Sequence, residues 1–315
     1  MLARFALLLP PLLLAVPRIL AQNSSSSPAP AVKLSGYLQG REVYQDNVGL
    51  TATLNRARLA AAGTVLGDVS WRIQGEFRTG SVGTGKASVA LQDAYVRWAH
   101  QALGIQVGQF KTPFTREFIT SLAEVETTDR AFVVDTLAPK RDIGVMADYA
   151  VGGLATFTAD IFNGDGQNVT ANADSSVLGV ARATYRIVPY LALGANVAAY
   201  FGDSTRYGVD VNFETPYGVL RAEFIGQSFD VGGDDDDGWY VLAASPVTPW
   251  LQPMVKYEQF ERGAVAAIPL EAWTFGANVR PWGRSTRITL EYVARTAGDP
   301  GVTRGLGLAQ FQVIF

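Results

Sequence analysis

Apolar and polar side chains alternate along most of the chain from residue 33 onward. In residues 69–78, for example, Val69 and Trp71 fall on one face, whereas Ser70 and Arg72 fall on the other. A period of two is typical of a β-strand with one apolar face. We expect about sixteen such stretches, beginning near Lys33, Leu54, Val69, Val89, Leu103, Arg141, Leu154, Ser176, Pro189, Thr205, Tyr217, Gly238, Leu251, Leu270, Ser285 and Gly305.

The connections between these stretches alternate in length. Tight turns are expected at 152–153, 188–189, 215–216, 246–249 and 281–283, and longer connections around 111–140, 163–175, 229–237, 261–269 and 296–304. An up-and-down barrel with short periplasmic turns and longer outer loops has this order, whereas a soluble sandwich of two sheets has no reason to keep it. A strand of ~9–11 residues also suffices to cross a membrane when tilted.

The polar face separates the two architectures. A soluble sandwich buries one layer of apolar side chains between its sheets, but here charged side chains occur on one face throughout. A sixteen-strand closed barrel places such a face around a water-filled lumen and its apolar face against lipid. Closure also satisfies every backbone donor and acceptor. We therefore predict an all-β fold, a transmembrane antiparallel up-and-down β-barrel of about sixteen strands.

Aromatic side chains near strand ends are expected to form interfacial girdles. They are Trp71, Tyr95, Trp98, Tyr149, Tyr185, Tyr200, Tyr217, Trp239, Trp250, Tyr257, Trp273, Trp282 and Phe315.

Composition excludes several other classes. A hydrophobic content of 48% excludes disorder, and the absence of cysteine excludes a disulfide scaffold and a thiolate metal site. His100 is the one histidine, so no imidazole cluster can bind a metal. Beyond the N-terminus no apolar run reaches the ~18 residues of a transmembrane helix. A net charge of −3 with both signs interspersed argues against a nucleic-acid partner.

The N-terminus resembles an export signal. Arg4 precedes an apolar stretch over residues 7–16 that contains two prolines, and a cleavage point is expected after Ala21, although Arg18 and Ile19 depart from the usual pattern. An uncleaved membrane anchor is the alternative. We predict a signal peptide over 1–21, a flexible Ser- and Pro-rich segment over 22–32, and an outer-membrane barrel over 33–315.

Several motifs resemble the phosphate-selective porin (O and P) family of Gram-negative outer membranes. Residues 107–114 read VGQFKTPF, and residues 141–145 read RDIGV; LNRARL at 54–59, LQDAYVR at 91–97 and FNGDG at 162–166 fit the same family. A terminal Phe315 is usual for outer-membrane barrels. The second half of the barrel resembles the family only in its general strand pattern and carries none of these motifs. The resemblance implies a sixteen-strand, trimeric, passive channel with one long loop folded into the lumen. It does not fix the solute.

The longest connection, residues 111–139, has an unusual apolar content. Phe118, Ile119, Leu122 and Val125 recur at helix-like spacing, which predicts a short amphipathic turn packed on the barrel wall. Loops of this length in a compact domain are usually functional or disordered, and the apolar content argues against disorder. We expect a constriction loop folded into the lumen. A lid over the mouth is the alternative.

Basic side chains on the predicted lumen face and on this loop are the candidate anion-binding residues, since rings of Arg or Lys favour anions and Arg pairs bidentately with phosphate. They are Arg56, Arg58, Arg72, Arg97, Lys111, Arg116, Arg130, Arg141 and Lys256. Acids share the predicted lumen face, and pairing across strands is the alternative role of the basic set. These acids are Glu42, Glu76, Asp93, Asp148, Asp160, Asp210, Glu223, Glu258 and Glu291.

Other candidate chemistry is weak. Asp234 to Asp237 form an acidic run that is expected to be solvated loop; a Ca²⁺ or Mg²⁺ site, or bridging to lipopolysaccharide through divalent ions, is the alternative. No Gly-x-Ser-x-Gly elbow or phosphate-cradling loop is present, and His100 falls in a predicted tight periplasmic turn, so neither an enzyme nor a cofactor is expected.

The sequence thus predicts a Gram-negative outer-membrane porin for passive diffusion of small hydrophilic solutes, with a preference for phosphate-like anions. A non-selective diffusion pore and a non-conducting barrel that serves as an anchor or adhesin are the alternatives. The expected partners are these solutes, outer-membrane lipid and lipopolysaccharide, and further copies of the chain in a homotrimer.

Overall fold

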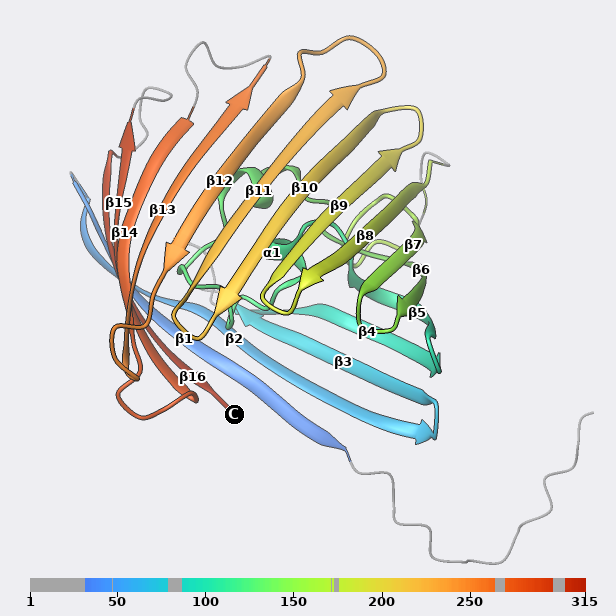
Figure 1. Cartoon of the computed structure of the whole chain (residues 1–315), viewed down its shortest axis with the longest axis horizontal. Coiled ribbons are helices and arrows are strands. Elements are labelled where there is room, and N and C mark those ends of the chain that lie inside the picture. Colours follow the sequence, from blue (N-terminus) through green and yellow to red (C-terminus); the bar gives the residue numbers. More distant parts are fainter. Residues whose placement is uncertain are drawn as a thin grey trace, which may run out of the picture.

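A computed structural model describes residues 32–46, 48–78, 87–170, 172, 176–263, 270–296 and 304–315. In this part of the chain, sixteen antiparallel strands form one closed barrel, in which each strand pairs with its neighbours in sequence and β1 pairs with β16 (Figure 1). The strands are β1 (Lys33–Gln45), β2 (Gly49–Leu66), β3 (Val69–Arg78), β4 (Ser88–His100), β5 (Leu103–Lys111), β6 (Arg141–Val151), β7 (Ala155–Phe162), β8 (Leu178–Val188), β9 (Leu191–Tyr200), β10 (Ser204–Thr215), β11 (Gly218–Phe229), β12 (Asp236–Ala244), β13 (Leu251–Arg262), β14 (Leu270–Val279), β15 (Thr286–Thr296) and β16 (Gly305–Ile314). The predicted up-and-down barrel is confirmed.

Strand β2 begins at Gly49, earlier than the predicted Leu54, whereas the other strands begin close to their predicted positions. The cause is a bulge. Gln39 of β1 pairs with Arg56 and Gly40 pairs with Leu54, so Asn55 is an extra residue on β2. An extra residue reverses the phase of the alternation, and the pattern before it no longer continues the pattern after it.

The chain termini of the barrel meet at one end. The backbone N–H of Phe315 donates to Gly36 O at 3.0 Å, and Gly36 N–H donates back to Phe315 O at 2.9 Å. The turns at this end are short, whereas 112–140 and most of the other long connections lie at the opposite end. The predicted short turns and long connections are therefore confirmed, but the alternation is not strict, because the connection 201–203 at the far end is also short.

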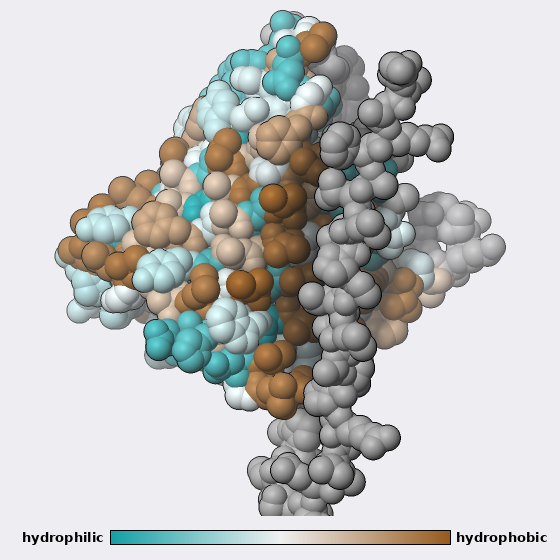
Figure 2. Space-filling view, turned by 90° about the vertical axis from the view of Figure 1, so that its right-hand side faces the viewer, coloured by the Kyte–Doolittle hydropathy of each residue, from teal (hydrophilic) through white to brown (hydrophobic). Residues whose placement is uncertain are grey.

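The two faces of the wall differ as the alternation predicts. Exposed Leu, Val and Ile side chains point outward, and Figure 2 shows apolar side chains over much of the middle of the visible face. Three expectations are wrong. Tyr95 contacts Phe110 inside the lumen, and the Arg206 guanidinium lies 4.7 Å from the centre of the Tyr200 ring, so neither tyrosine belongs to a girdle. Glu42 follows the lumen residue Arg41 and is exposed on the outer face.

The connection between β5 and β6 folds into the barrel (Figure 1), where it carries the helices α1 (Arg116–Ile119) and α2 (Phe132–Leu137). Neither described helix is long or apolar enough to cross a membrane. Phe114, Val133 and Leu137 are buried in one apolar cluster with barrel residues such as Phe162 and Ile225. The connection is therefore an inward loop, and the alternative of a lid is wrong. The predicted helical turn covers only α1, and α2 was not expected.

The predicted signal peptide lies outside the described residues, as does the flexible segment except for Val32. Both assignments stay predictions. The barrel fills the predicted range from Lys33 to the C-terminus, apart from the gaps given above.

Candidate functional site

The inward loop is fastened to one side of the barrel through its backbone. Three lumen carboxylates accept hydrogen bonds from loop N–H groups: Glu223 from Glu117 at 2.5 Å, Glu258 from Phe132 at 2.6 Å, and Glu291 from Thr128 at 2.7 Å. The Thr128 hydroxyl adds a 2.6 Å bond to the second oxygen of Glu291. Charged acceptors make hydrogen bonds of this kind stronger than neutral ones, so the three carboxylates hold the loop at three separate strands.

Donors on the neighbouring strands bind the loop carbonyls. These bonds are Gln39 to Leu122 O, Gln312 to Ala123 O, Arg287 to Val125 O at 2.8 Å and Asn278 to Glu126 O at 2.9 Å. Two ion pairs reinforce them. Arg221 lies 2.8 Å from the carboxylate of Glu126, and Arg41 lies 2.7 Å from that of Asp129. Loop residues 115–137 thus contact β1 and the strands from β9 to β16.

Burial changes the protonation of one loop group. Glu117 is 3% exposed, and its side chain accepts a hydrogen bond from Ala131 N–H at 3.0 Å. Desolvation raises the pKa of Glu117 to about 7, although Lys256, the bond from Ala131 and the charge of Arg130 oppose the rise. The loop side of this interface is therefore sensitive to pH near neutrality.

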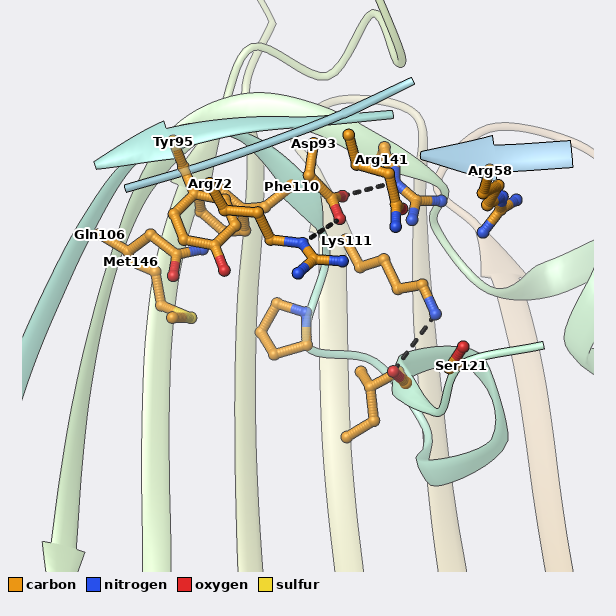
Figure 3. A pocket seen from close by; sticks show the side chains of 13 residues that line it. Arg58, Arg72, Asp93, Tyr95, Gln106, Phe110, Lys111, Ser121, Arg141 and Met146 are labelled. Atoms are coloured by element: carbon orange, nitrogen blue, oxygen red, sulfur yellow. Dashed lines mark hydrogen bonds and ion pairs between the residues drawn. The ribbon is translucent and has the colours of Figure 1, made fainter. Parts of the chain in front are cut away.

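The opposite side of the lumen, along β2 to β6, contacts the loop less: Lys111 of β5 donates to loop carbonyls, and Arg56 of β2 lies 3.6 Å from Asp129. A cavity of about 340 Å³ separates the loop from this wall (Figure 3). The strands contribute Arg58, Arg72, Gln74, Asp93, Tyr95, Gln106, Phe110, Lys111, Arg141 and Met146, and the loop contributes Pro113, Ile119 and Ser121. We call this cavity the gap. Four of the predicted anion-binding residues meet here, although they come from four different strands.

Positive charge exceeds negative charge in the gap. Asp93 is its one acid, and it is shared between Arg141, at 2.8 Å from Nε, and Arg72, at 3.5 Å from Nε (Figure 3). Arg58 donates to Glu76 at 2.6 Å. Lys111 Nζ donates to three loop carbonyls, of Phe118, Ile119 and Thr120, at 2.8–3.2 Å.

Pairing leaves a net positive charge. The Arg58–Glu76 pair is neutral, whereas Asp93 balances only one of its two arginines. A mobile anion passing through the gap therefore meets uncompensated positive charge.

The remaining predicted residues lie elsewhere. Arg56 faces the loop residue Asp129 at 3.6 Å. Arg97 forms a bidentate pair with Asp148. Arg130 and Arg116 belong to the loop, where Arg130 donates to the carbonyls of residues 117, 118 and 120. Lys256 is 4% exposed, is paired with Glu258 at 2.9 Å, and borders a second recess of about 260 Å³ between the loop and β13–β16. Their roles stay predictions.

Sequence reasoning did not single out the apolar lining of the gap. Tyr95 alternates in step with Asp93 and Arg97, so the phase of β4 could have placed it in the lumen. Ile119 was expected to pack on the wall, but it is 42% exposed and lines the gap. No pattern within the loop shows which face of a four-residue helix will be left uncovered.

Two weaker candidates have ordinary surroundings. Asp235 accepts from Ser228 Oγ at 3.0 Å and Asp236 from Gly263 N–H at 3.0 Å, and in the described residues no group of three or more acids or histidines could hold a metal ion. His100 ends β4, where it contacts Asp68 at 2.8 Å and stacks on Trp98.

Comparison with known proteins places the chain in a class. The family model for phosphate-selective porins O and P matches residues 39–223, more than half of the chain. Together with the closed barrel, the match defines an outer-membrane porin of Gram-negative type. The chain belongs to the phosphate-selective porin O and P family. No curated protein sequence matches it.

Solved structures share the fold at low sequence identity. OmpT of Vibrio cholerae in its trimer form is 11% identical with a TM-score of 0.68, over 91% of this chain and 100% of that one. The outer-membrane channel DcaP of Acinetobacter baumannii is 17% identical with a TM-score of 0.66, over 91% and 97%. A triple mutant of the Rhodopseudomonas blastica porin is 11% identical with a TM-score of 0.63, over 90% and 100%.

Proposed function

We propose that the chain is a passive channel that prefers small anions, phosphate-like anions among them. The observation that carries the proposal is the gap, where Arg72 and Arg141 share one acid, Asp93. Solutes diffuse down their gradient, and nothing is chemically transformed. The positive side chains replace part of the hydration that an anion loses on entering the gap, which lowers the barrier for anions and raises it for cations.

The proposed assembly is a homotrimer embedded in outer-membrane lipid and lipopolysaccharide, exported by the signal peptide over residues 1–21. The family match and the similarity to a structure described as a trimer support this part of the proposal. The exposed apolar side chains on the outer face, such as Leu38 and Phe275, are consistent with contact to lipid.

The test is the reversal potential in a salt gradient, measured on the full chain refolded into a planar bilayer. The wild type should show anion-selective sign. Asp93→Asn removes the shared acid and should increase the preference for anions, whereas Arg72→Gln should decrease it. Asp93→Asn keeps the side-chain size, whereas Arg72→Gln shortens the side chain. Because the two changes shift the net charge in opposite directions, opposite shifts of the reversal potential identify charge as the cause. Arg186→Gln is the matched control, since Arg186 lies outside the lining of the gap.

A reversal potential near zero in the wild type would instead indicate the non-selective diffusion pore, and the absence of conductance would indicate the anchor or adhesin. A cation-selective sign, or shifts of the same sign for both variants, would contradict the proposal.

A further inference from the structure

Part of the wall of the gap is apolar. Ile119 and Pro113 line it from the loop, and Phe110 and Met146 line it from the strands. Ile119 is 42% exposed although it lies inside the barrel. Figure 3 shows Tyr95, Phe110 and Met146 beside the Arg72 side chain, at the same end of the cavity. A channel for fully hydrated inorganic ions gains nothing from such a wall, because apolar side chains cannot replace water around an ion.

The hydrogen-bond donors of the gap are mostly engaged. Lys111 donates to three carbonyls and Arg58 to Glu76, and Arg141 is bound to Asp93. Arg72 has one ion pair among its described contacts, at Nε, and its terminal nitrogens extend into the cavity (Figure 3). A planar guanidinium fork pairs bidentately with one carboxylate or with two oxygens of a phosphate. The fork alone therefore does not separate the two anions, and the apolar surroundings of Arg72 have to do so.

The size of the gap fits a larger solute than an inorganic ion. Its volume of about 340 Å³ falls within the range of about 300–1,000 Å³ found for sites that bind small organic molecules. Such sites combine a mostly apolar lining with a few placed polar groups. The gap also places apolar groups beside charged ones, although eight of its thirteen lining residues are polar or charged and five are apolar or aromatic.

We propose that the gap selects organic monocarboxylates with an aromatic or compact hydrocarbon body over inorganic phosphate and over short carboxylates. The carboxylate pairs with Arg72, and the body lies between Ile119 and Pro113 on the loop and Met146 and Phe110 on the wall. This inference rests on the proposed anion channel and names the solute class of the same site. Removal of the apolar body from water adds affinity in proportion to its area, which acetate and phosphate cannot gain.

The test measures how benzoate, acetate and inorganic phosphate reduce the chloride current through the full chain in planar bilayers. Benzoate should reach half-block at a concentration about tenfold lower than acetate or phosphate. Ile119→Ser and Met146→Gln should each raise the half-block concentration of benzoate about fivefold and leave that of acetate unchanged. Val293→Ser is the matched control, because Val293 lines the second recess on the other side of the loop. Heat-modifiable migration on gels verifies that every variant folds.

Equal half-block by benzoate and acetate, in a channel whose reversal potential is anion-selective, would overturn this inference and leave the proposed function standing. The same holds if Ile119→Ser weakens the block by acetate as much as the block by benzoate, since Ile119 would then not act through contact with the apolar body of the solute. A cation-selective reversal potential would overturn the proposed function, and the inference with it.

Discussion

The contact between Glu291 and Thr128 gives the sharpest prediction about the inward loop. One carboxylate accepts both the N–H of Thr128, at 2.7 Å, and its hydroxyl, at 2.6 Å. A hydrogen bond to a charged group contributes about 1.5–3 kcal/mol. Thr128→Val removes the hydroxyl bond at nearly constant volume. Glu291→Gln removes the charge and turns one acceptor oxygen into a donor. Each change should therefore weaken loop docking by about 2 kcal/mol.

A loss of about 2 kcal/mol raises the population of the undocked loop about thirtyfold. Since the loop fills part of the lumen, undocking should appear in single-channel recordings as brief levels of higher conductance. Both variants act on one contact, so the double variant should resemble the single ones instead of doubling their effect. Glu261→Gln is the charge-matched control, because Glu261 is exposed and contacts Gln259. Unchanged recordings for both single variants, or fully additive effects, would refute the assignment of Glu291 as a loop anchor.

Two further predictions concern the folded barrel and its pH dependence. A Cβ added at Gly194 would collide with the ion pair between Arg182 and Asp210, whose charged atoms lie 2.6 Å apart. In urea titrations, Gly194→Ala should therefore lower the free energy of unfolding by about 3 kcal/mol or more. Gly67→Ala is the control and should change the free energy of unfolding little, because a Cβ there meets nothing within 4 Å. The pKa of Glu117 is about 7 in the folded state and about 4.5 in the unfolded state, so between these pH values only the folded state keeps the proton. The free energy of unfolding should therefore fall as the pH rises from about 4.5 to 7. Glu117→Gln should flatten this part of the pH profile, and a variant profile as steep as that of the wild type would contradict the pKa shift.

The strand pattern could be predicted almost completely because alternation is a local property of the sequence. It failed at β2, where the extra residue Asn55 reverses the phase. Glu42 lies on β1, whose alternation is unbroken, and its exposed face follows from the phase of Gln39 and Arg41. Tyr95 and Tyr200 lie near strand ends, as girdle residues do, but the phase of their strands places both side chains in the lumen. Local alternation is thus enough to predict the strands of the barrel, and a strand boundary is misplaced where one extra residue changes the register.

The gap could be predicted only in part. The sequence pointed to Arg58, Arg72, Lys111 and Arg141, since charge and alternation place them in the lumen. It could not show that the loop docks mainly on β1 and β9 to β16 and leaves a cavity along β2 to β6. That choice depends on single contacts between residues more than a hundred positions apart, such as Thr128 with Glu291. The partition of the basic residues between gap, loop and wall follows from the same docking.

In the proposed channel, solutes pass between the loop and the wall of β2 to β6, through a positively charged gap. The chain has no cysteine, so Ser121→Cys introduces a single thiol, and Ser121 lines the gap from the loop side (Figure 3). Negatively charged and positively charged methanethiosulfonate reagents of similar size can then be applied during bilayer recording. The account predicts that the negative reagent reacts faster, and that its attachment reduces both the conductance and the preference for anions. An unchanged conductance after complete modification, or faster reaction of the positive reagent, would contradict the account.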